Sequence, residues 1–271
     1  MARSLWFVRL LKKTFSQRFF YARLSKLPFL GSIMDRLLFE GDDIIYLPKN
    51  RAIAVNEDVP APGHAVLPSA VVDHFIETAS YHWVMNECIC RAATNCKDYP
   101  QDLGCLFLGE AVMGIHPALG RRVTKQEARE HIHRCRQAGL THLVGRNKID
   151  TVWLGVGPGH KLLTICNCCP CCCLWRMLPY LTERISGKVA RMPGVTVTVS
   201  DRCTGCGFCL DGVCFVDAIH LIESRVVHTQ ACRGCGHCAT VCPSGAIEIA
   251  YENDRIVQDS IARLSRLVDL S

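Results

Sequence analysis

The chain has 271 residues, 19 of them cysteine, and a formal net charge of +6 at pH 7. This length is enough for two modest domains, and the sequence contains no run long and apolar enough to predict a transmembrane helix. The cysteines stand in tight runs and we recognise no secretory signal, so we expect a reducing, cytoplasmic location rather than a secreted protein held by disulfides.

Residues 1–34 belong to a predicted N-terminal arm, residues 1–50, and carry seven Lys or Arg and no acidic residue. Their apolar positions follow a helical period. A basic amphipathic helix can lie on an anionic membrane, so peripheral membrane contact through residues 1–34 is one interpretation. We favour the other, that the arm packs on its own domain or on a partner subunit, because the apolar positions spread beyond one stripe. Nothing in the arm arranges side chains to read bases, so no nucleic-acid partner is expected.

Residues 51–190 are predicted to form a cysteine-rich, mostly helical, metal-binding domain. Prolines at 48–68 indicate an extended connection. A helix is expected at about 69–86, where apolar residues recur on one side, and the apolar run from Leu106 to Val112 is interpreted as another buried helix.

The second half of this domain contains a clear helix start. Thr124-Lys-Gln-Glu127 is a capping-box pattern, which opens a helix expected to end near Gly139. Short strands are predicted at 140–145 and 162–166 on either side of a glycine-rich turn.

Residues 191–252 are predicted to form a separate C-terminal domain, with an approximate internal repeat of segments 195–222 and 225–250. Alternation of apolar and polar residues predicts four strands, at 195–199, 219–222, 225–228 and 246–251. Apolar residues at helical spacing within residues 253–271 predict a closing amphipathic helix. The fold class expected for the whole chain is α+β.

Two cysteine runs lie between these strands. The second reads Cys232-x2-Cys235-x2-Cys238-x3-Cys242-Pro243, and the first reads Cys203-x2-Cys206-x2-Cys209-x4-Cys214, with Phe215 in place of the proline. The pattern resembles the bacterial two-cluster ferredoxins, in which the fourth cysteine of each run ligates the other cluster. The resemblance implies a ferredoxin-like domain with two 4Fe–4S clusters, one held by Cys203, Cys206, Cys209 and Cys242, the other by Cys232, Cys235, Cys238 and Cys214.

The alternative for these runs is a pair of zinc sites. Zinc takes two separated pairs of ligands and has no use for a third cysteine two residues further on, so iron–sulfur is favoured. The first run is the weaker half, because its extra residue should lengthen the turn that carries Cys214.

A second group of cysteines lies upstream. Residues 166–173 read Cys-Asn-Cys-Cys-Pro-Cys-Cys-Cys, and a Cys-x-Cys-Arg element begins at Cys88. This combination resembles poorly described ferredoxin-fused proteins of anaerobic microbes. Dense thiolates select iron–sulfur, zinc or copper(I), and we expect at least one additional iron–sulfur cluster, with zinc or redox-active thiols as alternatives. Cys135, on a predicted helix, is interpreted as a buried hydrophobe. The ligands favoured for this centre are Cys88, Cys90, Cys96, Cys105, Cys166 and Cys169.

These patterns predict an electron-transfer protein whose partners are low-potential redox proteins or oxidoreductase subunits. The main alternative is an oxidoreductase that reduces a small substrate at the N-terminal centre, fed by the ferredoxin clusters. A third is an assembly or membrane-docking adaptor that uses the basic arm. No nucleophile–base–acid grouping is supported by spacing, so no catalytic residue is predicted.

Overall fold

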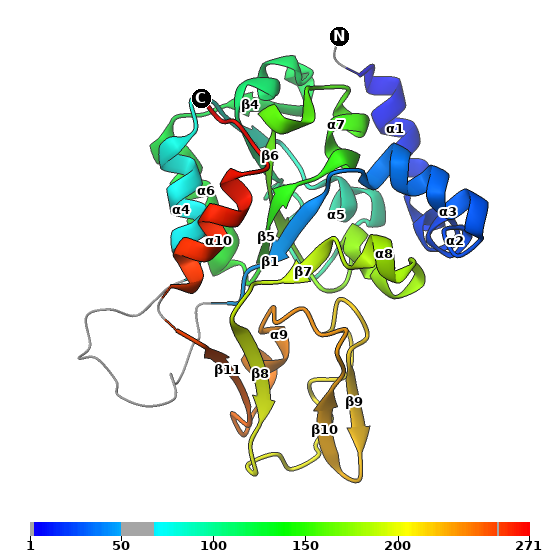
Figure 1. Cartoon of the computed structure of the whole chain (residues 1–271), viewed down its shortest axis with the longest axis vertical. Helices are drawn as coiled ribbons and strands as arrows, with labels where there is room; N and C mark the ends of the chain where they lie inside the picture. The colour runs from blue at the N-terminus through cyan, green and yellow to red at the C-terminus, as the bar shows by residue number, and fades with distance from the viewer. Residues whose placement is uncertain (1–2, 50–67, 254) are drawn as a thin grey trace.

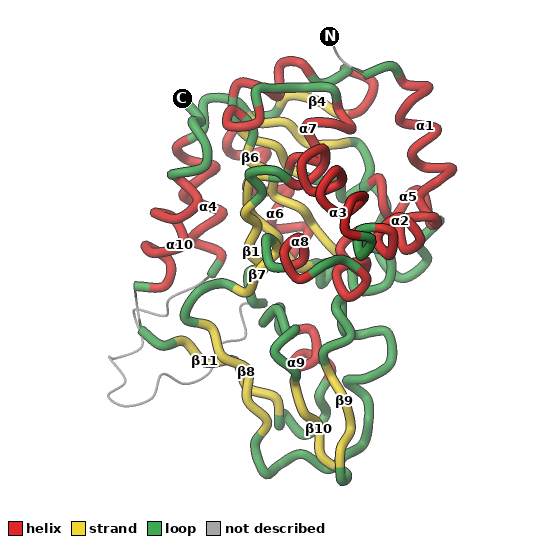
Figure 2. The backbone as a smooth tube through the Cα atoms, turned by 45° about the vertical axis from the view of Figure 1, so that its right-hand side comes forward, coloured by secondary structure: helices red, strands yellow, loops and turns green. Residues whose placement is uncertain are grey.

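The computed structural model describes residues 3–49, 68–253 and 255–271. Within them, a larger body is built around a seven-stranded sheet, and a smaller C-terminal unit, residues 195–251, extends from one end (Figures 1 and 2). The predicted connection at 48–68 lies, apart from its ends, outside the described residues. The mixture of helices and strands agrees with the predicted α+β class.

The order of the large sheet is β4-β2-β3-β6-β5-β1-β7, and neighbouring strands are antiparallel except β1 and β7. Its strands are β1 (Asp43–Tyr46), β2 (His82–Met85), β3 (Leu106–Leu108), β4 (Gly120–Arg122), β5 (Thr141–Arg146), β6 (Leu163–Cys168) and β7 (Val189–Arg191).

In the described part of the domain expected at 51–190, helical residues outnumber strand residues, but the organising element is this seven-stranded sheet. The run from Leu106 to Val112 is not a helix: it forms β3 and then the 3₁₀ turn η3 (Glu110–Gly114). All three residues of β3 are buried, so the strand shows no alternation, and periodicity could not separate it from a helix.

The helix expected at 69–86 is also shorter than predicted. It is α4 (Ser69–Thr78), and it ends because Ala79 adopts an extended backbone conformation. The chain then enters β2, which pairs with both β3 and β4.

Helices cover both faces of the large sheet. On one face α4, α6 (Lys125–Gln137) and α10 (Ile256–Ser265) bury an aliphatic core against residues such as Ile45. The other face carries Ile44 and Tyr46, because successive side chains of a strand point to opposite faces. That face is covered by α5 (Ile89–Thr94), α7 (Lys148–Leu154), α8 (Glu183–Ser186) and the 3₁₀ turn η6 (Leu174–Tyr180), with the 3₁₀ turns η4 (Pro117–Leu119) and η5 (Gly159–Lys161) nearby.

Several predicted elements are confirmed. The Thr124 capping box opens α6, with hydrogen bonds in both directions between Thr124 and Glu127. The strands expected at 140–145 and 162–166 are β5 and β6 within one or two residues, and the closing helix is α10. Cys135 is fully buried, as expected.

The N-terminal arm folds into α1 (Leu5–Thr14), η1 (Phe15–Gln17), α2 (Arg18–Leu24), α3 (Pro28–Met34) and the π-helical turn η2 (Asp35–Phe39). Val8, Phe15 and Ala22 are buried, and Phe15 and Ala22 belong to the core on the α5 side of the sheet. The interpretation that the arm packs on its own domain is confirmed for this face. None of the described helices is long and apolar enough to cross a bilayer.

The C-terminal unit contains the four predicted strands. β8 (Val195–Val199) pairs with β11 (Ile247–Tyr251), and β9 (Ile219–Ile222) pairs with β10 (Arg225–His228). The short helix α9 (His237–Val241) lies within the second cysteine run: it carries Cys238, and Cys242 is its C-cap residue. Apart from Cys238, the cysteines of both runs stand on loops and turns that connect these strands.

Candidate metal centres

The eight cysteines of the C-terminal unit line two pockets of four. One pocket is lined by Cys203, Cys206, Cys209 and Cys242. The other is lined by Cys214, Cys232, Cys235 and Cys238. Each pocket thus takes three cysteines from one run and one from the other, which is the division that the resemblance implied. We call them the outer pocket, where Cys206 is exposed, and the inner pocket, which faces the large sheet domain.

The two runs share one backbone geometry. Gly205 and Gly207 in the first run, and Gly234 and Gly236 in the second, all have positive φ between 65° and 81°. Glycine adopts this conformation without the steric cost that a Cβ adds. The loops can therefore curl tightly around each pocket.

The turn after the fourth cysteine is also repeated. The Sγ of Cys214 accepts a hydrogen bond from the Ala218 amide at 3.2 Å, and the Sγ of Cys242 accepts one from the Ala246 amide at 3.3 Å. The residue before each alanine has positive φ, 53° at Asp217 and 61° in the second run. The turns after Cys214 and Cys242 therefore match, and the extra residue of the first run lies before Cys214, in a segment that forms turns where the second run has the helix α9.

Burial makes bare thiolates costly in the inner pocket. It raises the pKa of Cys235 to about 12 and also raises the pKa of Cys238 and Cys232. A cation that replaces the thiol protons removes this cost, because metal ligands bind as thiolates. Four soft sulfur donors and inward amides match the requirements of an iron–sulfur cluster.

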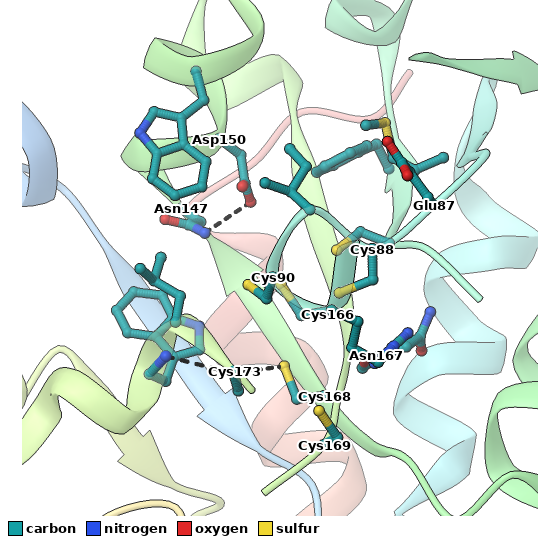
Figure 3. A pocket seen from close by; sticks show the side chains of 18 of the residues that line it. Glu87, Cys88, Cys90, Asn147, Asp150, Cys166, Asn167, Cys168, Cys169 and Cys173 are labelled. Atoms are coloured by element: carbon teal, nitrogen blue, oxygen red, sulfur yellow. Dashed lines mark hydrogen bonds between the residues drawn. The ribbon is translucent and has the colours of Figure 1, made fainter. Parts of the chain in front are cut away.

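A third pocket lies in the sheet domain, and we call it the thiol pocket (Figure 3). Cys88 is the N-cap of α5 and Cys90 lies in its first turn, while Cys166 and Cys168 project from β6. The Sγ atoms of Cys173 and Cys168 are 3.2 Å apart. Its six facing cysteines are Cys88, Cys90, Cys105, Cys166, Cys168 and Cys173.

Arg91 supports this pocket from behind. Its side chain is fully buried and donates to the carbonyl oxygens of Pro100 at 2.7 Å and Asn167 at 2.8 Å, and to that of Leu103. The hydrogen bond from Cys90 and the nearby Arg91 charge together lower the pKa of Cys88 to about 7, against the effect of burial. The hydrogen bond from Cys105 likewise lowers the pKa of Cys166, whereas hydrogen bonds with neighbouring thiols raise the pKa of Cys90, Cys105 and Cys168. Cys88 and Cys166 are therefore the thiols that favour the thiolate, the form that binds metals.

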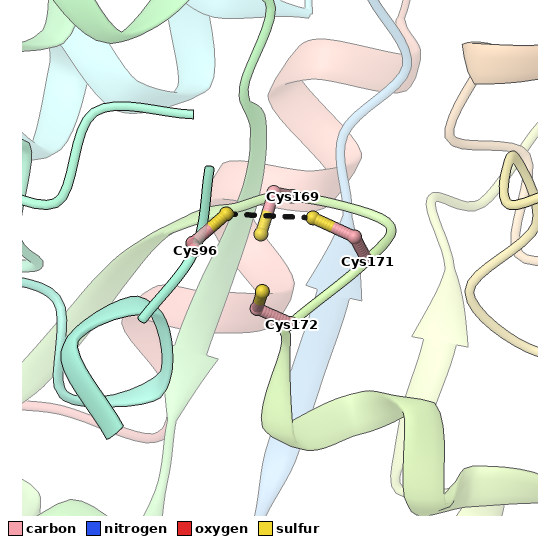
Figure 4. A group of neighbouring side chains, drawn as sticks. All are labelled: Cys96, Cys169, Cys171 and Cys172. Carbon is pink, nitrogen blue, oxygen red and sulfur yellow. Dashed lines mark hydrogen bonds between the residues drawn. The ribbon is translucent and has the colours of Figure 1, made fainter. Parts of the chain in front are cut away.

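A fourth group of thiols lies beside the thiol pocket (Figure 4). Its members are Cys96, just after α5, and Cys169, Cys171 and Cys172 in the turn after β6. Their Sγ atoms all lie within 4.8 Å of one another. We call it the four-cysteine group.

The structure divides the six N-terminal ligands expected from the sequence between two places. Cys88, Cys90, Cys105 and Cys166 meet in the thiol pocket. Cys96 belongs to the four-cysteine group. Cys169 lines the thiol pocket, but its Sγ atom lies with the sulfur atoms of the four-cysteine group. Cys168, Cys171, Cys172 and Cys173 belong to the cysteine-rich segment 166–173 but are not among the six ligands favoured from the sequence.

One of these omissions had a local signal. Cys166 and Cys168 are two residues apart on a predicted strand or its end, so their side chains share one face. Cys173 had no such signal, because it returns to the pocket through the turn that follows.

Two aromatic rings lie between the inner pocket and the thiol pocket. Tyr46 on β1 is fully buried, and its ring centroid lies 5.5 Å from that of Phe215 in an edge-to-face arrangement. Both rings pack in one core with Cys168, Cys173 and Cys232. Burial raises the pKa of Tyr46, and nearby thiolates, Cys173 first, raise it further. Its hydroxyl has no hydrogen-bond partner within the described part of the chain.

Comparison with known protein families gives one match. A 4Fe-4S binding domain matches residues 225–248, which contain the second cysteine run. No curated protein and no solved structure matches the chain. The match indicates an iron–sulfur protein.

Proposed function

We propose that the chain is an electron-transfer protein with two 4Fe–4S clusters in its C-terminal unit and a further iron–sulfur centre in the thiol pocket. The observation that carries this proposal is the division of eight cysteines into two interlaced sets of four. Such clusters exchange single electrons at potentials set by hydrogen bonds to sulfur and by burial.

The outer pocket is the proposed site of contact with a redox partner. Cys206 is exposed, and the neighbouring Phe208 side chain is 68% exposed. An exposed aromatic residue beside a cluster gives a low-potential donor or acceptor protein an apolar surface to pack on. The inner pocket is covered by the sheet domain, so electrons would enter or leave through the outer one.

The interior of the protein supports a route from the inner pocket to the thiol pocket. Tyr46 and Phe215 fill the space between them and exclude water, and the Cys168 and Cys173 thiols pack in the same core as Cys232. A dry, rigid medium between centres keeps their separation fixed during electron transfer.

The proposal is tested on the full chain, purified without oxygen. Two four-iron clusters alone would supply about eight iron and eight sulfide ions, and the thiol pocket should add to this number. We expect Cys235→Ser to remove the iron of the inner pocket and Cys166→Ser to reduce that of the thiol pocket, each with loss of one paramagnetic resonance signal.

Cys135→Ala is the matched control, because Cys135 is a fully buried cysteine that lines none of the three pockets. It should retain every iron and every signal. A reconstituted chain that stays colourless, or one that binds zinc without iron, would contradict the proposal.

A second candidate is reduction of a small substrate at the thiol pocket. Asp150 lines that pocket and accepts hydrogen bonds from Asn147 at 2.7 Å and Thr164 at 2.8 Å. Burial raises the pKa of Asp150, which shifts the carboxyl group toward the protonated form that a general acid needs. A substrate-dependent change in the resonance spectrum of this centre would favour the enzyme; rapid exchange with a protein partner and no such change would favour the carrier.

A further inference from the structure

We propose that the four-cysteine group, Cys96, Cys169, Cys171 and Cys172, binds one zinc ion in a closed tetrahedral site. This site is distinct from the thiol pocket beside it and from the two pockets of the C-terminal unit. The inference does not depend on the proposed electron-transfer function.

The spacing of the sulfur atoms carries the inference. All four Sγ atoms lie within 4.8 Å of one another, and those of Cys96 and Cys171 are 3.6 Å apart. Four thiolates at about 2.3 Å from a single zinc ion stand about 3.8 Å apart at the corners of a tetrahedron. In a cubane cluster each thiolate binds a different iron, so the four sulfurs stand further from one another.

The contrast within the chain supports a mononuclear site. Across the described residues, this is the one group of three or more His, Cys, Asp or Glu side chains with ligand atoms this close together. The C-terminal cysteines, which belong to the matched 4Fe-4S domain and its repeat, surround pockets without forming such a group.

The site is closed, which is typical of structural zinc. Cys96, Cys169 and Cys172 are each 8% exposed or less, and Cys171 is half-buried. They pack with Leu103 and Leu140 in a small apolar core. With four protein ligands no coordination position is open for a substrate.

Backbone contacts hold the ligands in place. The amide of Cys96 donates to the Arg91 carbonyl at 2.9 Å, and Gln101 donates to the Cys96 carbonyl at 3.1 Å. On the other side, the Arg176 guanidinium donates to the Cys171 carbonyl at 2.8 Å and puts a positive charge beside a site whose four thiolates and one Zn²⁺ sum to −2.

The position of the proposed zinc ion indicates a structural role. It would join the segment after α5 to the turn after β6, and these two elements carry four of the thiols of the thiol pocket: Cys88, Cys90, Cys166 and Cys168. A redox-inert ion at their junction would fix the separation of these thiols while the adjacent centre changes charge. Zinc suits this task because it has no redox chemistry and no preferred d-electron geometry.

The test is zinc analysis and zinc-edge X-ray absorption on the full chain, purified without oxygen. We expect one zinc per chain, with four sulfur neighbours at about 2.3 Å. Cys171→Ser and Cys172→Ser should each lose the zinc, and Cys135→Ala, which changes a cysteine in the same small core, should retain it.

Other results would overturn the assignment. A zinc-free chain in which these variants lose iron and sulfide would make the group part of a cluster. Iron without sulfide at the site, mixed nitrogen or oxygen neighbours at the zinc edge, or a Cys96–Cys171 disulfide with no bound metal would each exclude the zinc site. Because the absorption measurement uses the unaltered chain, a variant that fails to fold does not affect it.

Discussion

Tyr46 shows how much one buried polar atom can matter in this protein. Burying a hydroxyl group without a hydrogen-bond partner costs free energy. The Tyr46 hydroxyl is nevertheless buried without a partner among the described residues, in a core that contains thiols of both pockets. Thiolates and cluster sulfurs accept hydrogen bonds, so the hydroxyl has a natural partner once the centres are loaded. No local pattern in the sequence singles out this residue, because the sulfurs around it come from distant segments.

We expect Tyr46→Phe to lower the midpoint potential of the centre that the hydroxyl faces. Loss of a hydrogen bond to sulfur destabilises the more negative, reduced state; one net hydrogen bond corresponds to about 20–60 mV in a one-electron couple. Redox titration followed by paramagnetic resonance measures the shift.

Tyr251→Phe is the control for this substitution. Its hydroxyl is also buried and has no partner among the described residues, but it belongs to the core on the opposite side of the sheet. Equal potentials in the wild-type protein and Tyr46→Phe, or loss of iron from that variant, would remove the role proposed for the hydroxyl.

At the scale of elements, the loops of the two cysteine runs depend on glycine. At Gly205, which has φ of 68°, an added Cβ would lie 2.3 Å from the Ser224 carbonyl oxygen in the β9–β10 turn. Gly212 also has positive φ, 64°, but an added Cβ there meets nothing within 4 Å. Alanine substitutions at these two positions therefore distinguish the effect of backbone strain from the effect of steric overlap.

Gly212→Ala should lower stability by about 1–2 kcal/mol through backbone strain alone. Gly205→Ala should lower it by more and impair iron binding in the outer pocket, because the loop must move away from the turn. Thermal loss of cluster absorbance in the full chain measures both effects. Equal losses in the two variants would show that the Ser224 contact is unimportant.

The sequence predicts the C-terminal unit better than the sheet domain, for a physical reason. The cysteines of the two runs follow one another at fixed spacing, and the strands around them alternate visibly, so both are local signals. The interior strand β3 is buried on both faces and carries no alternation. The thiol pocket combines cysteines of α5 and β6 with Cys173, which follows the turn after β6. Which N-terminal cysteines belong to the thiol pocket and which to the four-cysteine group is apparent only in three dimensions.

At the scale of the whole molecule, the N-terminal arm leaves one apolar face uncovered. Phe29, Ile33 and Leu37 follow one another at helical spacing along α3 and η2, and they are 79%, 40% and 60% exposed. Lys26 and Arg36 are exposed on the same segment. We propose that this face contacts an anionic bilayer surface, since basic residues attract its headgroups while the apolar residues enter the interface.

Phe29→Ser combined with Ile33→Ser should reduce binding of the full chain to vesicles that contain phosphatidylserine. Met113→Ser, at a 52% exposed residue elsewhere, should leave it unchanged. Cosedimentation measures binding. Failure of the wild-type chain to bind, or equal binding to neutral phosphatidylcholine vesicles, would argue for a protein partner at this face.

The exchange of fourth cysteines between the two repeats has a consequence for how damage spreads. Oxidation of Cys242, which ends the second run, would strip a ligand from the outer pocket, whose other three ligands lie more than thirty positions earlier in the chain. A lesion at Cys214 would likewise harm the inner pocket, built mainly by the later repeat. In the proposed two-cluster arrangement, neither repeat can therefore mature on its own, and a nascent chain must extend past Cys242 before the outer pocket has all its donors.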